Sequence, residues 1–204
     1  VGFRKILNSI NKKKIKKVIL LSSLSVYGKV NSKKVTEKTS INNPDFYGRT
    51  KFIMEKDLIE FSKKKNFKYS ILRLPGIIGL DSQHNFLSKL IFSIKGNINN
   101  LILFNPELKF NNLLHVKTLS KVIKKCIESE KISGIFLLGS KHPVKIKYLM
   151  KSIKKFKKIK IKYKNNSNGF NLDISKALRY KIPLDSTKKA FLSFLNENLK
   201  IIKN

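Results

Sequence analysis

Residues 17–28 have the sequence KVILLSSLSVYG, a short apolar run that ends in two serines. The run is too short for a helix, and its continuous hydrophobicity predicts a buried strand of a parallel sheet. Tyr27-Gly28 and the polar stretch to Asn43 predict a loop after the strand. Because open α/β sheets bind ligands at the carboxyl ends of their strands, Ser23 is expected where a ligand would lie.

A helix is predicted to begin near Pro44-Asp45 and to run to about Lys65, since proline and an acidic residue favour a first turn. It carries Tyr47-Gly48-Arg49-Thr50-Lys51, a Tyr-x-x-x-Lys motif. Positions i and i+4 share a helix face, so the Lys51 ammonium can lie beside the Tyr47 phenol. A nearby cation favours the phenolate of a tyrosine. Tyr47 could then exchange a proton at neutral pH, while Ser23 hydrogen-bonds the same substrate oxygen.

A surface helix with an incidental Tyr and Lys is the alternative, because about one residue in five of this chain is lysine. However, positions 47, 51, 54, 58 and 61 (Tyr, Lys, Met, Leu and Phe) form one stripe of the helix. The stripe predicts that the pair extends the core-facing side. A lysine without a partner is costly there, which favours a functional interpretation.

The rest of the chain alternates between helical and extended patterns. Helices are predicted over residues 3–10, 85–95, 118–127, 146–153, 175–180 and 186–199. Strands are predicted over residues 69–74, 101–104, 113–116, 135–138 and 158–164. Strands that alternate with helices predict an α/β fold with a largely parallel sheet.

The composition excludes several classes of protein. An apolar fraction of 41% excludes a disordered chain, and no apolar run approaches the roughly 18 residues that span a membrane. The single cysteine, Cys126, predicts a reducing compartment and a cytoplasmic location. The histidines at 84, 115 and 142 form no ligand cluster, so no metal site is predicted and His115 is expected to be structural.

The net charge of +33 favours nucleic acid or an anionic surface as partner, so a nucleic-acid-binding module is one alternative. Only four of the 45 basic residues are arginines, whereas sequence-specific sites favour arginine. The many Lys, Asn and Ile residues indicate an AT-rich genome instead. Specific nucleic-acid binding is therefore not expected, although weak affinity for polyanions follows either way. Residues 141–164 in particular are interpreted as a solvated face, with a polyanion-binding surface as the alternative.

Together these motifs resemble the extended short-chain dehydrogenase/reductase family, the NAD-dependent epimerases and dehydratases that act mainly on sugar nucleotides. The similar segments are residues 1–8, 22–28, 35–37, 47–51, 72–79, 113–116 and 173–177. The resemblance implies a partial doubly wound (Rossmann-like) parallel sheet with a smaller C-terminal α/β substrate-binding region. It divides the chain into residues 1–80, the C-terminal part of the dinucleotide-binding domain, and residues 81–204, the substrate-binding region, whose strand and helix return to the sheet.

The resemblance also implies roles for individual residues. Ser23, Tyr47 and Lys51 would form the catalytic triad, in which Tyr47 is the acid/base of hydride transfer and Ser23 holds the reacting oxygen. Lys51 would also bind the nicotinamide ribose, Tyr47 would be another cofactor-binding residue, and the backbone around Pro75 and Gly76 would line the nicotinamide pocket. The substrate would be a nucleotide sugar, the cofactor NAD or NADP, and the assembly a homodimer. The implied substrate-binding residues are Ser23, Ser25 and Asn85.

The sequence departs from the family pattern in three places. It has no Gly-x-x-Gly-x-x-Gly turn, which would hold the pyrophosphate, so the chain is expected to lack the first half of the sheet. A truncated, non-catalytic relic is therefore an alternative to an enzyme. Asn111 replaces a basic residue that binds diphosphate in the family, although Lys109 is near enough to substitute. Thr118 replaces an aspartate and is expected to cap a helix, and Glu37 is expected either to contact substrate or to form a loop salt bridge.

Overall fold

The computed structural model describes residues 2–11, 13–83, 85–96, 100–153, 160–164 and 169–199. Its helices are α1 (Gly2–Ser9), the 3-10 helix η1 (Leu24–Tyr27), α2 (Phe46–Lys65), α3 (Phe86–Lys95), α4 (Val116–Glu128), α5 (Ile146–Ile153), α6 (Ser175–Arg179) and α7 (Thr187–Leu199). Its strands are β1 (Lys17–Ser23), β2 (Lys34–Val35), β3 (Lys68–Leu74), β4 (Gly76–Ile78), β5 (Asn100–Phe104), β6 (Lys109–Phe110), β7 (Leu113–His115), β8 (Gly134–Leu137), β9 (Val144–Lys145), β10 (Lys160–Lys164) and β11 (Asn171–Leu172).

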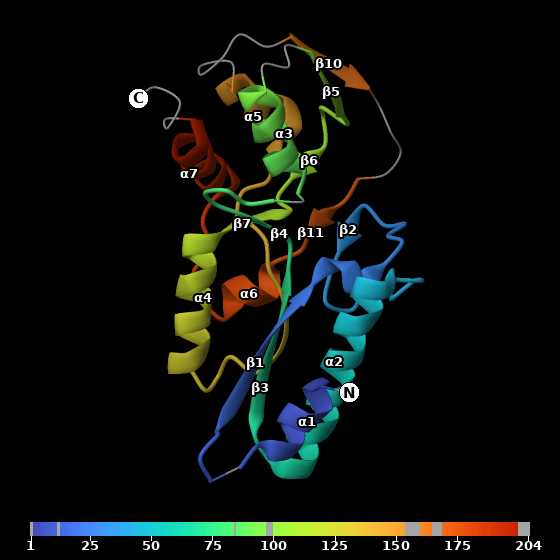
Figure 1. The fold of residues 1–204 in the computed structure, drawn as a ribbon, viewed down its shortest axis with the longest axis vertical. Coiled ribbons are helices and arrows are strands. Elements are labelled where there is room, and N and C mark those ends of the chain that lie inside the picture. The colour runs from blue at the N-terminus through green and yellow to red at the C-terminus, as the bar shows by residue number, and fades with distance from the viewer. Residues whose placement is uncertain are drawn as a thin grey trace.

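A parallel sheet of three strands, in the order β1-β3-β8, forms the centre of the lower lobe in Figure 1. Helices α1 and α2 cover one face of this sheet, and α4 and α6 cover the other. Side chains along β3 alternate between two cores: Ile71 packs with α1 and α2, whereas Leu72 packs with α4 and β8. We call this part of the molecule the sheet lobe.

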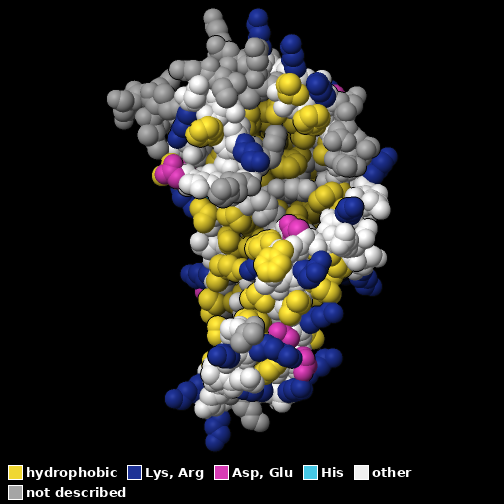
Figure 2. All heavy atoms as spheres, turned by 45° about the vertical axis from the view of Figure 1, so that its right-hand side comes forward, with side chains coloured by type: hydrophobic (Ala, Val, Ile, Leu, Met, Phe, Trp, Pro, Cys, Tyr) yellow, Lys and Arg dark blue, Asp and Glu magenta, His cyan; other side chains and the backbone are white. Residues whose placement is uncertain are grey.

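A second lobe is built around helices α3, α5 and α7, with the β5–β10 strand pair at its side (Figure 1). It has its own hydrophobic core, to which all three helices contribute buried side chains such as Ile91, Met150 and Phe194. The β4–β7 pair lies between this helical lobe and the sheet lobe. Figure 2 shows a hollow in the upper half of the molecule that is lined mainly by hydrophobic side chains.

The predicted α/β class with a parallel sheet is confirmed, because every pairing between described strands except β6–β9 is parallel. Strand β8, which lies beyond residue 80, pairs with β3 in the central sheet. The division of the chain into domains at residue 80 stays a prediction. No helix in the described part of the chain combines the length and hydrophobicity that crossing a bilayer requires.

Three details of the sequence prediction are wrong. Strand β1 is the edge of the described sheet, so it is less buried than expected and Leu21 is 37% exposed. Helix α4 begins at Val116 and is capped by His115, not by Thr118, whose hydroxyl instead bonds the Asp185 carboxylate at 2.5 Å. The buried face of α2 is turned slightly from the predicted stripe, so Leu58 is buried but Tyr47 is not.

The short β2–β11 pair is fastened by Asp173, which follows β11. Its carboxylate forms a 2.7 Å ion pair with Lys34 and accepts hydrogen bonds from the backbone and hydroxyl of Ser175. The hydrogen bond from Lys34, and then those from Ser175, lower the pKa of Asp173 from 3.8 to about 2. The carboxylate therefore stabilises the fold above its unfolded pKa, and this contribution is lost as the pH falls through about 2.

We expect Asp173→Asn to reduce the free energy of unfolding at neutral pH by about 1–2 kcal/mol. This figure is the energy equivalent of the pKa shift of Asp173, lowered because Lys34 is exposed to solvent. The difference between the variant and the unmodified protein should shrink between about pH 4 and pH 2 and disappear at the lower end. Urea unfolding across this pH range measures it. A difference that stays constant over the range would contradict the assignment.

Candidate active site

The carboxyl end of β1 turns directly into η1 through two serines. The hydroxyl oxygen of Ser23 accepts the Ser25 backbone N–H at 3.1 Å and thereby caps η1. The same hydroxyl donates to the Ser25 hydroxyl at 3.2 Å. Both side chains are half-buried. Two hydroxyl groups are thus held together at the end of a parallel strand, where α/β sheets bind their ligands.

The first turns of α2 bring Tyr47 and Lys51 to the same end of the sheet. Asp45 caps the helix as predicted, accepting the Gly48 N–H at 2.7 Å. The Lys51 ammonium lies 5.7 Å from the centre of the Tyr47 ring, on the face that the i, i+4 spacing predicts. It also donates to the Leu21 carbonyl at 3.0 Å, two residues before Ser23. Lys51 therefore joins the Tyr47 face of α2 to the end of β1.

Gly48 allows α2 to lie against η1. A Cβ atom placed on Gly48 would be only 2.1 Å from the Ser25 carbonyl oxygen. No side chain fits at this position without moving one of the two backbones. The helix that carries Tyr47 is thus pressed directly against the serine turn.

We expect Gly48→Ala to destabilise the protein by about 1–3 kcal/mol, because the added methyl group overpacks a backbone contact. Gly2→Ala is the matched control, since nothing lies within 4 Å of a Cβ atom there and alanine is the better helix former. It should be neutral or stabilising by up to about 1 kcal/mol. Thermal unfolding of both variants measures the contrast, and effects of the same sign would contradict the close approach.

Pro75 and Gly76 follow the carboxyl end of β3, the strand next to β1. A Cβ atom on Gly76 would lie 3.7 Å from the Cβ of Asn85, so the structure brings these two predicted residues together. The Asn85 amide donates to the Ile77 carbonyl at 3.1 Å and accepts the Ser88 N–H at 2.8 Å. Asn85 therefore caps α3 and ties it to β4, and this structural use stands beside its expected contact with substrate.

A buried ion pair lies behind the serine turn, and the sequence analysis missed its carboxylate. Glu55 of α2 and Arg73 of β3 meet at 2.7 Å, with side chains only 1% and 4% exposed. Glu55 also accepts a hydrogen bond from the Ser22 hydroxyl, and Arg73 donates to the Tyr27 hydroxyl at 3.0 Å. The pair therefore links α2, β1, β3 and η1. The sequence did offer a sign of this carboxylate, because Glu55 follows Lys51 by one turn of the same predicted helix.

The network holds its arginine charged. Burial has the largest single effect and lowers the pKa of Arg73, but its hydrogen bonds and charge interactions with Glu55 and Tyr27 together outweigh burial, so the pKa is raised. Burial also raises the pKa of Tyr27, although the adjacent Arg73 guanidinium, 4.8 Å from the ring centre, opposes this shift. Tyr27 therefore serves here as a hydrogen-bonding anchor, donating onward to the Thr36 carbonyl at 2.8 Å.

The family model "NAD dependent epimerase/dehydratase family" matches residues 1–139. The chain belongs to the NAD-dependent epimerase/dehydratase family. The match includes the serine turn, the Tyr-x-x-x-Lys helix and the β3–β4 segment.

Individual members of the epimerase/dehydratase family are distant relatives. UDP-glucose 4-epimerase of Lactobacillus helveticus is 32% identical over 81 residues, which are 40% of this chain and 24% of that protein. The structure of UDP-glucuronic acid 4-epimerase from Bacillus cereus in complex with NAD matches 98% of this chain at 20% identity, with a TM-score of 0.79. The match covers 64% of the Bacillus chain. UDP-N-acetylglucosamine 4-epimerase from Methanobrevibacter ruminantium in complex with UDP-N-acetylmuramic acid also has a TM-score of 0.79, at 22% identity over 99% of this chain and 67% of that chain. At these identities the solved structures show the fold alone.

Two residues that the sequence analysis singled out have structural contacts. Asn111 is 1% exposed, and its amide pairs with both backbone groups of Leu172 at 2.9 Å. It therefore holds β11 as a neighbouring strand would. The Glu37 carboxylate accepts the Leu137 N–H at 3.0 Å, and its expected contact with substrate stays a prediction.

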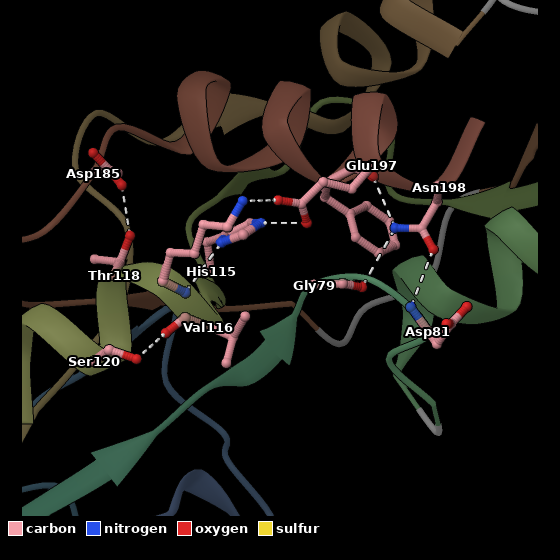
Figure 3. Close-up of polar contacts among 11 residues, drawn as sticks. Gly79, Asp81, His115, Val116, Thr118, Ser120, Asp185, Glu197 and Asn198 are labelled. Atoms are coloured by element: carbon pink, nitrogen blue, oxygen red, sulfur yellow. Dashed lines mark hydrogen bonds and ion pairs between the residues drawn. The ribbon is translucent and has the colours of Figure 1, made fainter. Parts of the chain in front are cut away.

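His115 has the structural role expected of it, at the contact between α4 and α7 (Figure 3). Its Nδ1 accepts the Lys117 N–H at 3.2 Å, so Nε2 carries the proton and donates to Glu197 at 3.0 Å. Next to it, Asn198 of α7 bonds the Gly79 carbonyl and the Asp81 N–H at 3.3 and 3.4 Å (Figure 3). Among the residues that the structure describes, no three His, Cys, Asp or Glu side chains come together as metal ligands would; residue 84 lies outside them.

Proposed function

We propose that residues 1–204 form part of an NAD(P)-dependent oxidoreductase of the epimerase type, which acts on a nucleotide sugar through Ser23, Tyr47 and Lys51. One observation carries the proposal. The Lys51 ammonium lies over the Tyr47 ring at 5.7 Å and bonds the Leu21 carbonyl at 3.0 Å, beside the serine turn. A cation, a phenol and a hydroxyl are thus available at the carboxyl end of one parallel strand.

Tyr47 would be the acid/base. Its side chain is 52% exposed, so the phenol is accessible to a sugar hydroxyl. Tyr47 would take the hydroxyl proton as the carbon is oxidised and return it afterwards, with the Lys51 ammonium 5.7 Å from its ring. The Ser23 hydroxyl, held in place by Ser25, would hydrogen-bond the same oxygen. Ser25 and Asn85 would contact the rest of the substrate.

The residues present fit the nicotinamide end of the cofactor. Lys51 offers an ammonium to the ribose, and Gly76 presents backbone without a side chain, where a Cβ atom would lie in ordinary contact with the Asn112 carbonyl at 3.6 Å. When bound, the nicotinamide supplies the hydride acceptor and donor. This sequence contains no Gly-x-x-Gly-x-x-Gly turn, the motif that would bind the pyrophosphate of the cofactor. Residues 1–80 would be the C-terminal part of the dinucleotide-binding domain, and residues 81–204 the substrate-binding region, whose strand β8 returns to the central sheet.

The assay is sugar epimerisation by a protein that contains residues 1–204, supplied with NAD and with UDP-glucose, UDP-glucuronic acid or UDP-N-acetylglucosamine. These sugar nucleotides are chosen because the relatives are named for them. We expect inversion of one hydroxyl-bearing carbon of the sugar, which proton NMR detects. Reduced nicotinamide should appear transiently and is measured by its absorbance. If such a protein binds no dinucleotide and converts none of these sugars, the non-catalytic alternative holds.

A further inference from the structure

The β5–β10 pair has one face in the core and one face in solvent. The strands are parallel, and Ile102 and Phe104 lie opposite Lys162 and Lys164. Leu103, which points the other way, is 4% exposed and packs into the core of the helical lobe. Ile102 and Phe104 are instead 53% and 50% exposed. We call the face formed by Ile102, Phe104, Lys160, Lys162 and Lys164 the lysine face.

An open face of this kind is unusual for parallel strands. Parallel sheets are normally covered on both faces, because their crossover connections pack on each side. Two large apolar side chains of the lysine face, Ile102 and Phe104, each remain about half exposed. A partner that covers apolar surface would therefore stabilise it.

The charge of the lysine face selects the chemistry of the partner. Lys160, Lys162 and Lys164 are exposed and form no salt bridge with any residue in the described part of the chain. The nearby carboxylate of Glu107 is already paired with Lys145 and Lys147, at 2.8 and 2.5 Å. A second copy of this chain, with its own charge of +33, would be repelled. A polyanion complements the face.

We infer that the lysine face binds single-stranded nucleic acid without sequence preference. Alternate residues of a strand are about 6.6 Å apart, so the three lysines form a straight row that can follow a phosphate backbone. The row of Ile102 and Phe104 lies about 4.8 Å to one side, where unpaired bases can stack on the phenyl ring. Unpaired bases expose flat apolar surfaces that a duplex keeps stacked inside.

The charges of the lysine face all come from lysine and none from arginine, which favours backbone contacts over the reading of bases. This agrees with a non-specific site.

The test is fluorescence anisotropy of a labelled oligouridylate with the 204-residue chain over a series of salt concentrations. The variant carries Lys160→Gln, Lys162→Gln and Lys164→Gln, and the control carries Lys29→Gln, Lys33→Gln and Lys38→Gln in the loop between η1 and α2. Both change the net charge from +33 to +30, since each loses three lysines. All six lysines are exposed, so neither variant should disturb the fold.

We expect the first variant to lower the slope of log affinity against log salt by about 2, because each phosphate contact contributes about 0.7. At about 0.15 M salt this corresponds to a loss of roughly 50-fold in affinity. The control should keep its slope. Phe104→Ala should weaken binding by about tenfold while leaving the slope unchanged, because it removes stacking and no charge.

Equal losses in the two lysine variants would overturn the proposal, because net charge alone would then explain binding. Failure of the unmodified chain to bind the oligouridylate at physiological salt would also overturn it. A third outcome would also overturn the proposal: the chain binds phosphatidylserine vesicles through the same three lysines but does not bind the oligouridylate. The lysine face would then be a membrane-surface contact.

Discussion

We expect Tyr47→Phe to lower kcat by a factor of about 100 to 10,000 in an active protein that contains residues 1–204. The phenyl ring keeps its place beside the Lys51 ammonium, 5.7 Å away in the structure, but has no proton to exchange. Dinucleotide affinity should change little, because the contacts of Lys51 and of the Gly76 backbone remain. Steady-state kinetics give kcat, and quenching or enhancement of NADH fluorescence gives the affinity.

The matched control for this variant is Tyr148→Phe. Tyr148 also lies on a helix and is 48% exposed, close to the 52% of Tyr47, but it is on α5 in the helical lobe. If Tyr47 is the acid/base, Tyr148→Phe should leave kcat unchanged. Retention of turnover in Tyr47→Phe would remove the acid/base role from this residue.

Arg73→Met is expected to cost about 3–5 kcal/mol of stability, because it leaves the Glu55 carboxylate buried without its partner. Ser22 and Tyr27, which bond to the same network, lose part of their support as well. Combining Arg73→Met with Glu55→Leu should recover most of the loss, since an apolar pair of similar volume removes the uncompensated charge. Urea unfolding of both single variants and the double variant measures the coupling.

An exposed ion pair provides the comparison. Lys68 and Glu130 meet at 2.7 Å, but their side chains are 51% and 70% exposed. Lys68→Met should therefore change stability little. If Arg73→Met costs no more than Lys68→Met, or if the double variant is as unstable as the sum of the two single variants, the buried pair does not organise this end of the sheet.

Sequence periodicity predicts best the elements that are long and whose buried and exposed positions repeat regularly. Helix α2 begins and ends where its proline, its Asp45 cap and its hydrophobic spacing place it, and β3 begins one residue before the predicted start. Strands β2 and β11 have two residues each, which is too short for any period to show. The cap of α4 was not predicted because histidine is not a usual capping residue, and its ring is oriented in part by Glu197, which is 82 residues away in the sequence.

The candidate site could be predicted only where local spacing decides it. The i, i+4 geometry of Tyr47 and Lys51 is local, and the structure has it. The approach of Gly48 to Ser25 and the pairing of Glu55 with Arg73 depend on how two elements pack, and no pattern along one element contains that information. The same holds for Asn111, whose partner Leu172 is 61 residues away. The catalytic roles themselves stay predictions.

Helix α7 gives the last part of the chain an influence on the opposite lobe. Through Asn198 it holds the loop at Gly79 and Asp81, a few residues after Gly76. Its Phe191 and Phe194 also fill the core of the helical lobe. A protein that ended before Thr187 would thus lose core packing and the hydrogen bonds of Asn198, and not merely a surface helix. Peptide tags or premature stops in this region should loosen the segment after β4, which Asn198 contacts.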